Sequence, residues 1–452
     1  MKFTGLATFI IAATFTAGAF AADVTPTRVG PVSQYGQLMA GKNAQGKGRI
    51  YGSCEGVKDG AEVQVRGMSL YWSLMDEALE FWSDEGVASM VNDMKIQIVR
   101  AAMATGDEDW TEGKYIGYQK QPEAQTGFMK AAIEAAIKQD IYVIIDWHSH
   151  VANTQTDNAV KFFTEMAKEY GQYDHVIFEV FNEPQKISWN EVKNYANQVI
   201  SAIRQYSDNL ILVGNPEWDQ NPQQAIGNEV SDPKKNTAYT LHYYAASHKA
   251  TGDYDWGPGE GTRGQQAIDA GLSVFVSEWG TGKADGKGDV SPNNGAWQDF
   301  MNQNKLSWAN WSASKINEGT AAFSANATKT SLQYSNSGNT VKGYLSNNPT
   351  TYTACRANQP ASSSSGESIA IPMFKSQEFS LNVHGRTLQL NSAGSGNAKV
   401  EVFDMLGHTQ LQKETLLGSG PNTISLEDIP KGNYIVRVSQ GKKLAQANFQ
   451  VK

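Results

Sequence analysis

Two glutamates in this sequence lie at the ends of apolar runs. Glu183 is the next-to-last residue of the run "VIFEVFNEP" (176–184), and Glu278 lies near the end of "SVFVSEWG" (273–280). If both runs are strands of one parallel sheet, their carboxyl ends meet at the same edge and the two carboxylates face one cleft. Such a pair can hydrolyse a glycosidic bond, because one group protonates the leaving oxygen while the other attacks the anomeric carbon or activates water.

Other residues at the ends of apolar runs suit a cleft for sugars. Arg100 would hold the nucleophilic carboxylate ionised and oriented. Asparagine and histidine can hydrogen-bond hydroxyl groups, and the flat faces of tryptophan can stack on pyranose rings. Tyr244 shares a strand face with His242. For Trp72, a place in the core is an equally good interpretation. The candidates for hydroxyl binding and for stacking are His148, Asn182 and His242, and Trp72, Trp218 and Trp311.

Glu179, inside the first run, shares the strand face of Glu183 but lies deeper in the sheet. A buried carboxylate needs a partner, and we expect Arg66 on the first strand to supply it, which makes Glu179 part of the scaffold. The aspartate and two histidines of "DWHSH" (146–150) also permit a metal site. No HExxH motif or cysteine cluster supports that interpretation, so we expect neither a metal ion nor another cofactor.

The elements that hold these residues alternate between β-branched runs and amphipathic stretches such as "GFMKAAIEAAIKQ". Eight strands separated by helices over ~250 residues are typical of a (β/α)8 barrel. A doubly wound open sheet is disfavoured, because no glycine-rich phosphate fingerprint follows the first strand. The expected strands are 63–69, 96–103, 142–148, 176–184, 210–218, 237–245, 273–280 and 307–314.

The composition excludes several classes of protein. The chain has 452 residues, 40% of them hydrophobic, which is enough for one large core and a second domain. A formal net charge of -8 disfavours nucleic acid as a partner. Lys2, an apolar run and small residues up to Ala21 predict a signal peptide over residues 1–21. No later stretch has the ~20 apolar residues of a transmembrane segment, so we expect an exported mature chain.

The only two cysteines, Cys54 and Cys355, nearly bracket the central region. In an oxidising compartment they could form a disulfide between its start and its end, and two free thiols are the alternative. A bond that closes so long a loop would stabilise the fold by about 5 kcal/mol in the chain-entropy account.

A serine-rich segment, "PASSSSGES" (360–368), ends the central region and predicts a flexible linker. Alternating stretches beyond it, such as "NYIVRVSQ", predict a small antiparallel β-domain. The expected organisation is a signal peptide at 1–21, a catalytic barrel at 22–356, a linker at 357–368 and the β-domain at 369–452.

Six motifs together resemble the secreted bacterial endoglucanases of glycoside hydrolase family 5, namely "VRAAM", "YVIIDWH", "VIFEVFNEP", "LHYYA", "FVSEWG" and "LSWANWS". The resemblance covers about residues 63–323 and implies a (β/α)8 barrel that cleaves internal β-1,4 bonds of glucans with retention of configuration. It implies that Glu183 is the general acid/base and that Glu278 is the nucleophile, hydrogen-bonded by Arg100 and Tyr244. It further implies sugar-binding or supporting roles for His148, Asn182, His242, Trp311 and Lys315.

Two departures from the family pattern leave the preference for sugar subsites open. Tyr71 stands where many relatives carry a histidine, and the loop "GPGEGTRGQQAIDAG" (257–271) is distinctive. A mannanase, a xylanase or a mixed-linkage glucanase is the alternative within the enzymes. A non-catalytic glycan-binding protein is the alternative from another class.

The tail motifs "VEVFDMLG", "ISLEDIPKGNYIVRV" and "ANFQVK" resemble the sorting domain of type IX secretion substrates. The resemblance implies secretion machinery as a partner and a location outside the cell or on its outer surface. A carbohydrate-binding module is the alternative, and it is disfavoured because residues 369–452 contain no tryptophan.

Overall fold

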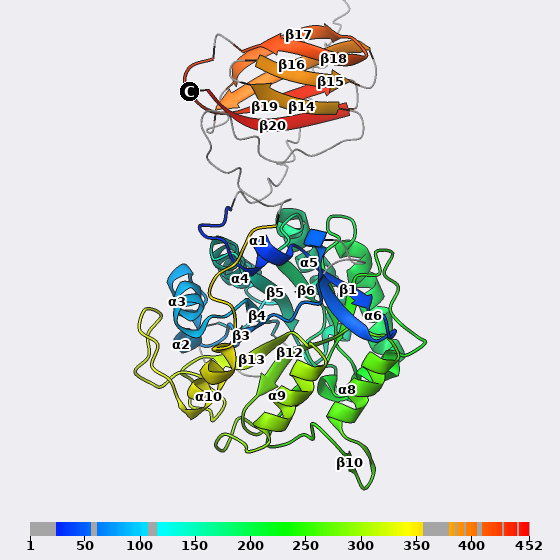
Figure 1. Cartoon of the computed structure of the whole chain (residues 1–452), viewed down its shortest axis with the longest axis vertical. Coiled ribbons are helices and arrows are strands. Elements are labelled where there is room, and N and C mark those ends of the chain that lie inside the picture. The colour runs from blue at the N-terminus through cyan, green and yellow to red at the C-terminus, as the bar shows by residue number, and fades with distance from the viewer. Residues whose placement is uncertain are drawn as a thin grey trace, which may run out of the picture. The chain divides into compact units, whose positions relative to one another are not determined.

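A computed structural model gives the structure of the chain as two compact units, divided after Gln359. Figure 1 shows both units. The expected signal peptide at 1–21 and the expected linker at 357–368 lie outside the described residues. The structure describes residues 24–55, 61–106, 115–355, 379–384, 387–392, 395–404, 409–426, 429–440 and 443–451.

Eight parallel strands of the first unit form a closed barrel, which confirms the expected (β/α)8 fold (Figure 1). Each strand pairs with the next barrel strand, and the last one, β13, pairs with both β12 and β3. All seven residues of β4 and of β5 are buried, because helices cover the outside of a parallel barrel and side chains fill its inside. The barrel strands are β3 (Arg66–Leu70), β4 (Ile98–Ala104), β5 (Tyr142–His148), β6 (Val176–Glu179), β7 (Ile211–Val213), β8 (Thr237–Thr240), β12 (Val274–Gly280) and β13 (Trp308–Ala313).

Three of the expected strands are shorter than predicted or divided. β6 ends at Glu179, and β7 covers three residues of the expected 210–218. The run expected at 237–245 is divided into β8 and the short β9 (Tyr243–Tyr244), because the amide of His242 donates to the carbonyl of Asp219 instead of to a strand (3.0 Å). Several polar residues therefore lie on loops that begin at the strand ends.

Helices alternate with the strands around the barrel (Figure 1). Helix α6 (Trp189–Ile203) begins at a capping box, in which the Ser188 hydroxyl accepts from the amide of Glu191 and the Glu191 carboxylate accepts from the amide of Ser188. Among the described residues, no helix is long and apolar enough to cross a membrane. The remaining α-helices are α1 (Pro31–Tyr35), α2 (Asp76–Leu79), α3 (Asp84–Met94), α4 (Pro122–Lys138), α5 (Thr156–Tyr170), α7 (Pro216–Asp219), α8 (Glu260–Asp269), α9 (Asn294–Gln303) and α10 (Asn336–Leu345).

A β-hairpin that the sequence analysis did not predict precedes the barrel. Its strands, β1 (Leu38–Lys42) and β2 (Gly48–Gly52), pair antiparallel. Leu38 and Ile50 belong to the same buried cluster as Ile98, which begins β4. The hairpin therefore covers the end of the barrel opposite the carboxyl ends of the strands.

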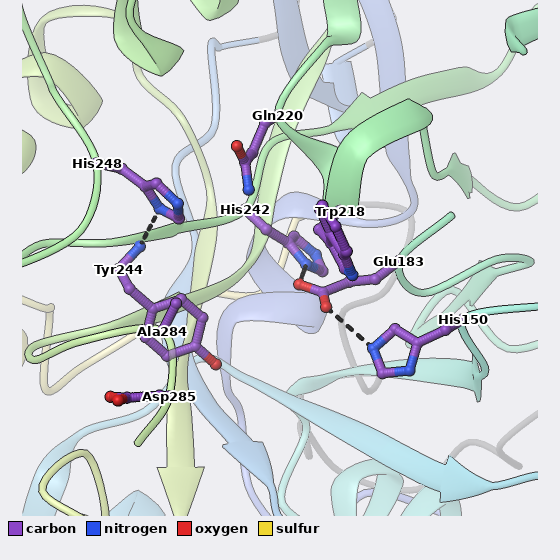
Figure 2. Close-up of a pocket in the computed structure, with 9 residues that line it drawn as sticks. All are labelled: His150, Glu183, Trp218, Gln220, His242, Tyr244, His248, Ala284 and Asp285. Atoms are coloured by element: carbon purple, nitrogen blue, oxygen red, sulfur yellow. Dashed lines mark hydrogen bonds and ion pairs between the residues drawn. The ribbon is translucent and has the colours of Figure 1, made fainter. Parts of the chain in front are cut away.

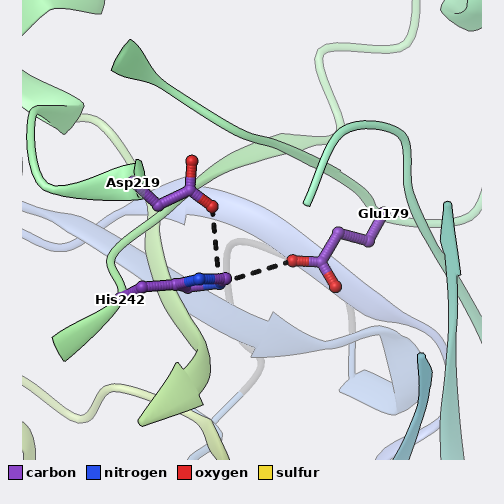
Figure 3. A group of neighbouring side chains, drawn as sticks. All are labelled: Glu179, Asp219 and His242. Carbon is purple, nitrogen blue, oxygen red and sulfur yellow. Dashed lines mark ion pairs between the residues drawn. The ribbon is translucent and has the colours of Figure 1, made fainter. Parts of the chain in front are cut away.

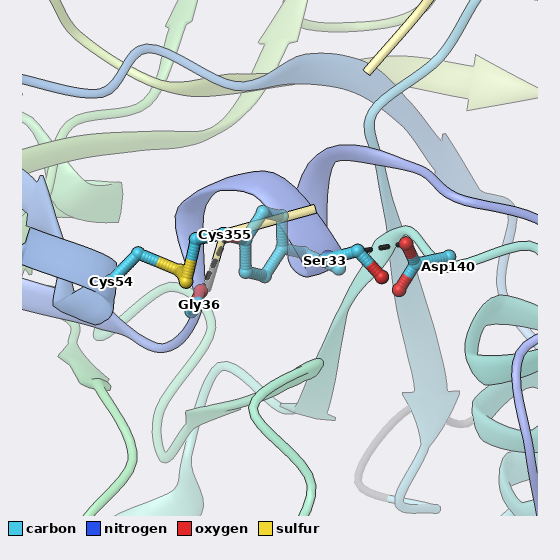
Figure 4. The surroundings of a disulfide bond; sticks show 6 residues. Ser33, Gly36, Cys54, Asp140 and Cys355 are labelled. Atoms are coloured by element: carbon cyan, nitrogen blue, oxygen red, sulfur yellow. Dashed lines mark hydrogen bonds between the residues drawn. A yellow bond between two sulfur atoms is a disulfide. The ribbon is translucent and has the colours of Figure 1, made fainter. Parts of the chain in front are cut away.

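The predicted disulfide between Cys54 and Cys355 is present, with Cα atoms 6.0 Å apart (Figure 4). The amide of Cys355 donates to the carbonyl of Ser33 (2.9 Å), and the amide of Ser33 donates to Asp140 Oδ2 (3.1 Å). The bond thus ties the end of the described first unit to its N-terminal segment, beside the turn between α4 and β5.

The second unit consists of two antiparallel sheets, as expected for a small β-domain. Its core contains Leu388, Val400, Ile424 and Val436. One sheet has the order β14, β15, β18, and the other has the order β17, β16, β19, β20. Their bounds are β14 (Phe379–His384), β15 (Thr387–Ser392), β16 (Gly396–Asp404), β17 (Thr409–Leu417), β18 (Gly420–Ser425), β19 (Gly432–Gln440) and β20 (Lys443–Val451).

Candidate active site

The carboxyl ends of the barrel strands bring together residues that are far apart in the sequence. Arg100 lies on β4, His148 on β5 and Glu278 on β12, and Glu183 follows β6. A cleft of about 460 Å³ opens at this end of the barrel (Figure 2). Its lining residues are His150, Glu183, Trp218, Gln220, His242, Tyr244, His248, Ala284 and Asp285.

Arg100 is fully buried and connects the acidic groups beneath the cleft. Its guanidinium donates to Glu278 Oε2 (2.9 Å), Glu179 Oε2 (2.6 Å) and Asn182 Oδ1 (2.6 Å), and it lies 3.0 Å from Asp146 Oδ2. Burial alone would lower the pKa of Arg100, but the surrounding carboxylates raise it above its usual value. The guanidinium therefore stays charged and orients Glu278 and Asn182 together.

Glu179 is fully buried, as expected of a scaffold residue, but the prediction that Arg66 is its partner is wrong. The strand register explains the difference, because Ser69 of β3 is level with Arg100 of β4. Arg66 begins β3 and so lies three residues nearer the closed end of the barrel. Glu179 is level with Asp146, beyond Arg100 toward the cleft. Of the two arginines, Arg100 is therefore the one that reaches the Glu179 carboxylate.

His242 lies among three carboxylates, two of which Figure 3 shows. Its Nδ1 is 3.0 Å from Glu183 Oε1. Its Nε2 is 3.4 Å from Asp219 Oδ2, 3.7 Å from Glu179 Oε1 and 2.9 Å from the hydroxyl of Ser277. Burial would lower the pKa of His242, but the carboxylates outweigh burial and raise it well above 6.5. The ring is therefore an imidazolium that donates a proton to the hydrogen bond with Glu183.

Asp219 is a site residue that the sequence analysis missed. It ends a segment in which three consecutive residues, Glu217, Trp218 and Asp219, have φ values of 61°, 59° and 59°. Residues other than glycine rarely adopt this left-handed conformation, and its cost is accepted most often at functional sites. Here it directs the Asp219 carboxylate toward His242 and Trp218 toward the cleft. No local sequence pattern marks such a turn.

Glu183 lies in the cleft between two histidines (Figure 2). Its Oε1 contacts His242 Nδ1 at 3.0 Å, and its Oε2 contacts His150 Nε2 at 3.2 Å. Burial raises the pKa of Glu183, but the hydrogen bonds from His150 and His242 outweigh burial and lower the pKa to about 2. From the sequence, His150 was a candidate only as a metal ligand, so this contact with Glu183 was not predicted.

Glu278 lies close to both Glu183 and His242. One oxygen of each carboxylate lies within 4.8 Å of the other, and both lie within that distance of the imidazole. Glu278 Oε2 accepts from Arg100 (2.9 Å), and Oε1 accepts from the hydroxyl of Tyr244 (2.7 Å). Burial and the Glu183 carboxylate raise the pKa of Glu278, against the opposing effect of its cationic neighbours and Tyr244.

An aromatic group adjoins the carboxylates. His148 stacks on Trp311 with ring centroids 5.3 Å apart, and Trp72 meets His148 edge-on at 5.1 Å. Tyr71 lies 5.0 Å from Trp311, which is only 7% exposed and so is largely covered by this group. Asp146 Oδ2 is 2.7 Å from His148 Nδ1, and burial lowers the pKa of His148 well below 6.5. His148 is therefore neutral and can exchange hydrogen bonds with a hydroxyl group.

Lys315, a sugar-binding candidate by resemblance, already has protein partners. Its ammonium group pairs with Glu80 and donates to the carbonyl of Ala327 (3.2 Å). Glu318, which was not predicted as a site residue, accepts a hydrogen bond from the hydroxyl of Tyr71 (2.9 Å). Burial raises the pKa of Glu318. A glutamate in the loop after the last strand has no motif that distinguishes it from a solvated acid.

The two histidines of "DWHSH" contact different carboxylates, His148 that of Asp146 and His150 that of Glu183. Within the described ranges, the side-chain groups compact enough to hold a metal ion contain neither of these histidines. The two groups are Glu179, Asp219 and His242, and Glu183, His242 and Glu278. Their atoms take part in the hydrogen bonds and ion pairs described above.

Comparisons with known proteins match the two parts of the chain separately. The model of the cellulases of glycosyl hydrolase family 5 matches residues 57–317, and that of the secretion system C-terminal sorting domain matches residues 382–452. Endoglucanase Z of Dickeya dadantii is 41% identical over 261 residues, which are 57% of this chain and 57% of that protein. Cellulase CelDZ1 of Thermoanaerobacterium is 34% identical over 291 residues, which are 59% of this chain and 70% of that protein.

A solved structure from Cytophaga hutchinsonii is 34% identical, with a TM-score of 0.61, and the match covers 70% of this chain and 96% of that one. The chain spans 57%, 35% and 53% of the length of three curated endoglucanases, so it matches only part of each of them. The match to the cellulase family model lies in the first unit, which contains the barrel.

Proposed function

Because the chain belongs to glycosyl hydrolase family 5, the cellulase family, we propose that it is an endo-β-1,4-glucanase that cleaves internal bonds of cellulose and related glucans with retention of configuration. One observation carries the proposal: Glu183, just after β6, and Glu278, on β12, bring carboxylate oxygens within 4.8 Å of each other. Retaining enzymes hold their carboxyl groups about 5–5.5 Å apart, whereas inverting enzymes leave roughly 6.5–9.5 Å for a water molecule.

In the proposed reaction, Glu278 attacks the anomeric carbon and Glu183 gives its proton to the leaving glycosidic oxygen. The carbon–oxygen bond breaks, and a covalent glycosyl ester of Glu278 forms. Water then attacks the same carbon, gives a proton to Glu183 and releases the sugar, which restores both carboxyl groups. Arg100 and Tyr244 support these roles, because their fixed hydrogen bonds stabilise Glu278 as an anion.

The surroundings of the two carboxyl groups shift their pKa values in the opposite sense to these roles. The two histidines favour ionised Glu183, while burial and the Glu183 charge favour protonated Glu278. Two carboxylates so close together titrate as a unit. In the proposed complex, the glycosidic oxygen accepts a hydrogen bond from protonated Glu183, and the positive charge that develops at the anomeric carbon stabilises ionised Glu278. Substrate binding therefore favours protonated Glu183 and ionised Glu278.

We assign the remaining site residues to positioning and sugar binding. His148, Asn182 and His242 hold the carboxylates or exchange hydrogen bonds with hydroxyl groups, and Trp218 lines the cleft as a stacking surface. Trp72 and Trp311, with Tyr71, bound the neighbouring part of the site. Lys315, which pairs with Glu80, is proposed to bind a sugar unit next to the cleavage point.

The substrate class is inferred from relatives named as endoglucanases. A mannanase, xylanase or mixed-linkage glucanase would use the same carboxylates with different hydroxyl contacts. Initial rates on carboxymethylcellulose, mixed-linkage glucan, mannan and xylan distinguish them, and a rate on mannan or xylan above that on both glucans contradicts the proposed substrate.

We further propose that the protein is exported by type IX secretion. The expected signal peptide and the match of residues 382–452 to a secretion sorting domain support this proposal. Deletion of residues 369–452 should leave active enzyme inside a type IX secreting host, and unchanged export of the truncated protein contradicts the assignment.

The catalytic proposal is tested with Glu183→Gln and Glu278→Gln. Each should lower kcat on carboxymethylcellulose by about 10³-fold or more, since each removes one reacting group. The exposed Glu229, changed to Gln, is the matched control and should keep full activity. Full activity in either cleft variant would falsify the assignment.

Chemical rescue separates the two roles. On an activated aryl cellobioside, azide should give the β-glycosyl azide with Glu183→Ala, because azide attacks the glycosyl ester of Glu278. With Glu278→Ala, azide attacks the substrate directly and should give the α-glycosyl azide. The same anomer from both variants contradicts the division of roles.

A further inference from the structure

A second hairpin lies between β9 and α8. Its strands are β10 (Asp253–Tyr254) and β11 (Gly257–Pro258), which pair antiparallel, and Asp255 and Trp256 form the turn. Figure 1 shows the hairpin projecting from the first unit beyond α8. Because it follows a barrel strand and precedes a helix, it belongs to the loops on the same side of the barrel as the cleft.

Trp256 is 74% exposed, more than any other large aromatic side chain in the described parts of the chain. Two-residue hairpin turns favour glycine, asparagine and aspartate, so turn geometry does not explain a tryptophan at this position. Its ring is parallel to that of Tyr254, with centroids 4.6 Å apart and planes at 4°. Although Tyr254 stacks on one face, most of the Trp256 residue stays exposed, so a large part of its ring surface is open to solvent.

Two neighbouring side chains hold the Tyr254 ring in place. Its hydroxyl donates to Glu260 Oε2 (2.9 Å), and Glu260 is only 2% exposed. Lys249 Nζ lies 4.5 Å from the centroid of the Tyr254 ring and donates to the carbonyl of Asp253 (2.7 Å). The two stacked rings are therefore a supported platform, which loses little conformational freedom when a ligand binds.

Arg263 connects the platform to the cleft. It is 5% exposed, its Nε donates to the carbonyl of Pro258 (2.9 Å), and its guanidinium carbon lies 5.7 Å from the centroid of the Trp256 ring. Its Nη1 donates to the carbonyl of Gln220 (3.3 Å), and Gln220 lines the cleft beside Trp218 (Figure 2). The platform therefore adjoins the Trp218 side of the cleft.

We propose that Trp256, supported by Tyr254, is a second carbohydrate-binding site that holds a β-glucan chain extending from the Trp218 side of the cleft. The ligand class rests on the proposed function. The open ring matches the apolar C–H face of a pyranose. One exposed ring is far too small for a stable protein interface, which needs ~1,000 Å² of buried surface, so a sugar chain is the occupant that fits.

Binding is measured by native affinity electrophoresis of the full mature chain in gels that contain hydroxyethylcellulose. Glu278→Gln is the parent, because it removes hydrolysis during the run. Adding Trp256→Ala should raise the dissociation constant about 3- to 10-fold, the size of one lost ring-stacking contact, and Trp256→Phe should restore most of the binding. The exposed Tyr206, between α6 and β7 on the opposite side of the barrel, is the matched control, and Tyr206→Ala should change nothing.

Turnover of two substrates provides the second readout. In the active enzyme, Trp256→Ala should lower the rate on swollen cellulose more than the rate on an aryl cellobioside, which is too short to reach the hairpin. Inactivity of the wild type on every β-glucan contradicts the proposed function, whereas an active wild type whose gel retardation Trp256→Ala does not change overturns only the second site. Equal losses in the Tyr206 variant also overturn it. So does a concentration-dependent dimer in the wild type that Trp256→Ala abolishes, because the occupant is then a second copy of the chain.

Discussion

At the scale of single residues, the two carboxylates of the cleft differ through their hydrogen-bond donors. Glu278 is held by Arg100 and by Tyr244, groups that keep their protons across the range in which carboxyl groups titrate. Glu183 is held by two histidines, and the hydrogen bonds from both lower its pKa. The two proposed roles, nucleophile for Glu278 and acid/base for Glu183, therefore go with two different sets of donors.

Tyr244→Phe removes one donor from Glu278 and keeps the ring. We expect kcat to fall about 10²-fold, as is usual for the loss of one hydrogen bond to a reacting charge. The Tyr244 hydrogen bond lowers the pKa of Glu278, so its removal raises that pKa and moves the acid limb of the kcat/KM profile to higher pH. Rates on carboxymethylcellulose from pH 3 to 10 test this, and an acid limb that moves to lower pH contradicts it.

His150→Ala removes a donor from Glu183. The hydrogen bond from His150 lowers the pKa of Glu183, so the variant should raise the pKa of the carboxyl pair. Because the acid/base must be protonated at the start of the reaction, the basic limb of kcat/KM should move to higher pH. The same pH series measures the shift, with the thermal midpoint as a check on folding. An unchanged basic limb would contradict the effect of His150 on the pKa of Glu183.

At the scale of elements, one ion pair holds the end of α6 against the segment that leads into β8. Arg204 follows α6, and its Nε and Nη2 each lie 2.8 Å from an oxygen of Asp232. The same carboxylate accepts from the amide of Asn236 (2.9 Å) and the hydroxyl of Thr237 (2.8 Å), where β8 begins. This pair fixes the start of the strand that leads to His242.

Asp232→Asn should therefore lower stability in a pH-dependent way. Burial raises the pKa of Asp232, but Arg204 and the other donors outweigh burial and lower it from 3.8 to about 2. A lowered pKa contributes stability that is full above about pH 4 and lost as the pH falls through about 2, and it amounts to about 2 kcal/mol at neutral pH. Urea unfolding of the wild type and the variant should differ at pH 7 and converge near pH 2.

The control for this prediction is Asp208→Asn. Asp208 pairs with Lys234 at 2.9 Å, but both side chains are about half exposed, so the loss should be below about 1 kcal/mol. A difference for Asp232→Asn that is equally large at pH 2 and pH 7 contradicts the electrostatic explanation.

At the scale of the whole molecule, one covalent bond joins the two ends of the described first unit. The disulfide between Cys54 and Cys355 spans 301 positions of sequence and lies beside the hairpin that covers the closed end of the barrel. The carboxylates lie at the opposite end, so the bond should affect stability far more than chemistry.

The double variant Cys54→Ser with Cys355→Ser should lower the free energy of unfolding by about 5 kcal/mol, because the unfolded chain regains the freedom of a long loop. The thermal midpoint should fall, while kcat on carboxymethylcellulose at 25 °C should be unchanged. Reduction of the wild type with dithiothreitol is the matched test and should give the same midpoint. An unchanged midpoint in both contradicts the stabilising role.

The sequence by itself determined the barrel, the second β-domain and the identity of the two facing glutamates. Strand periodicity and run ends are local properties, and a parallel barrel collects all strand ends on one side, so Glu183 and Glu278 could be paired without coordinates. For the two cysteines, the sequence allowed one pairing, Cys54 with Cys355, and left two free thiols as the alternative; the structure shows the bond.

Only the tertiary structure decided which partner each charged group has. Arg100 rather than Arg66 holds Glu179, because the register between strands that are not neighbours sets the height of each side chain in the barrel. Asp219 reaches His242 through a left-handed turn, and the stacked platform of Trp256 arises within a loop. Such contacts depend on distances between segments remote in sequence, and local periodicity carries no information about them.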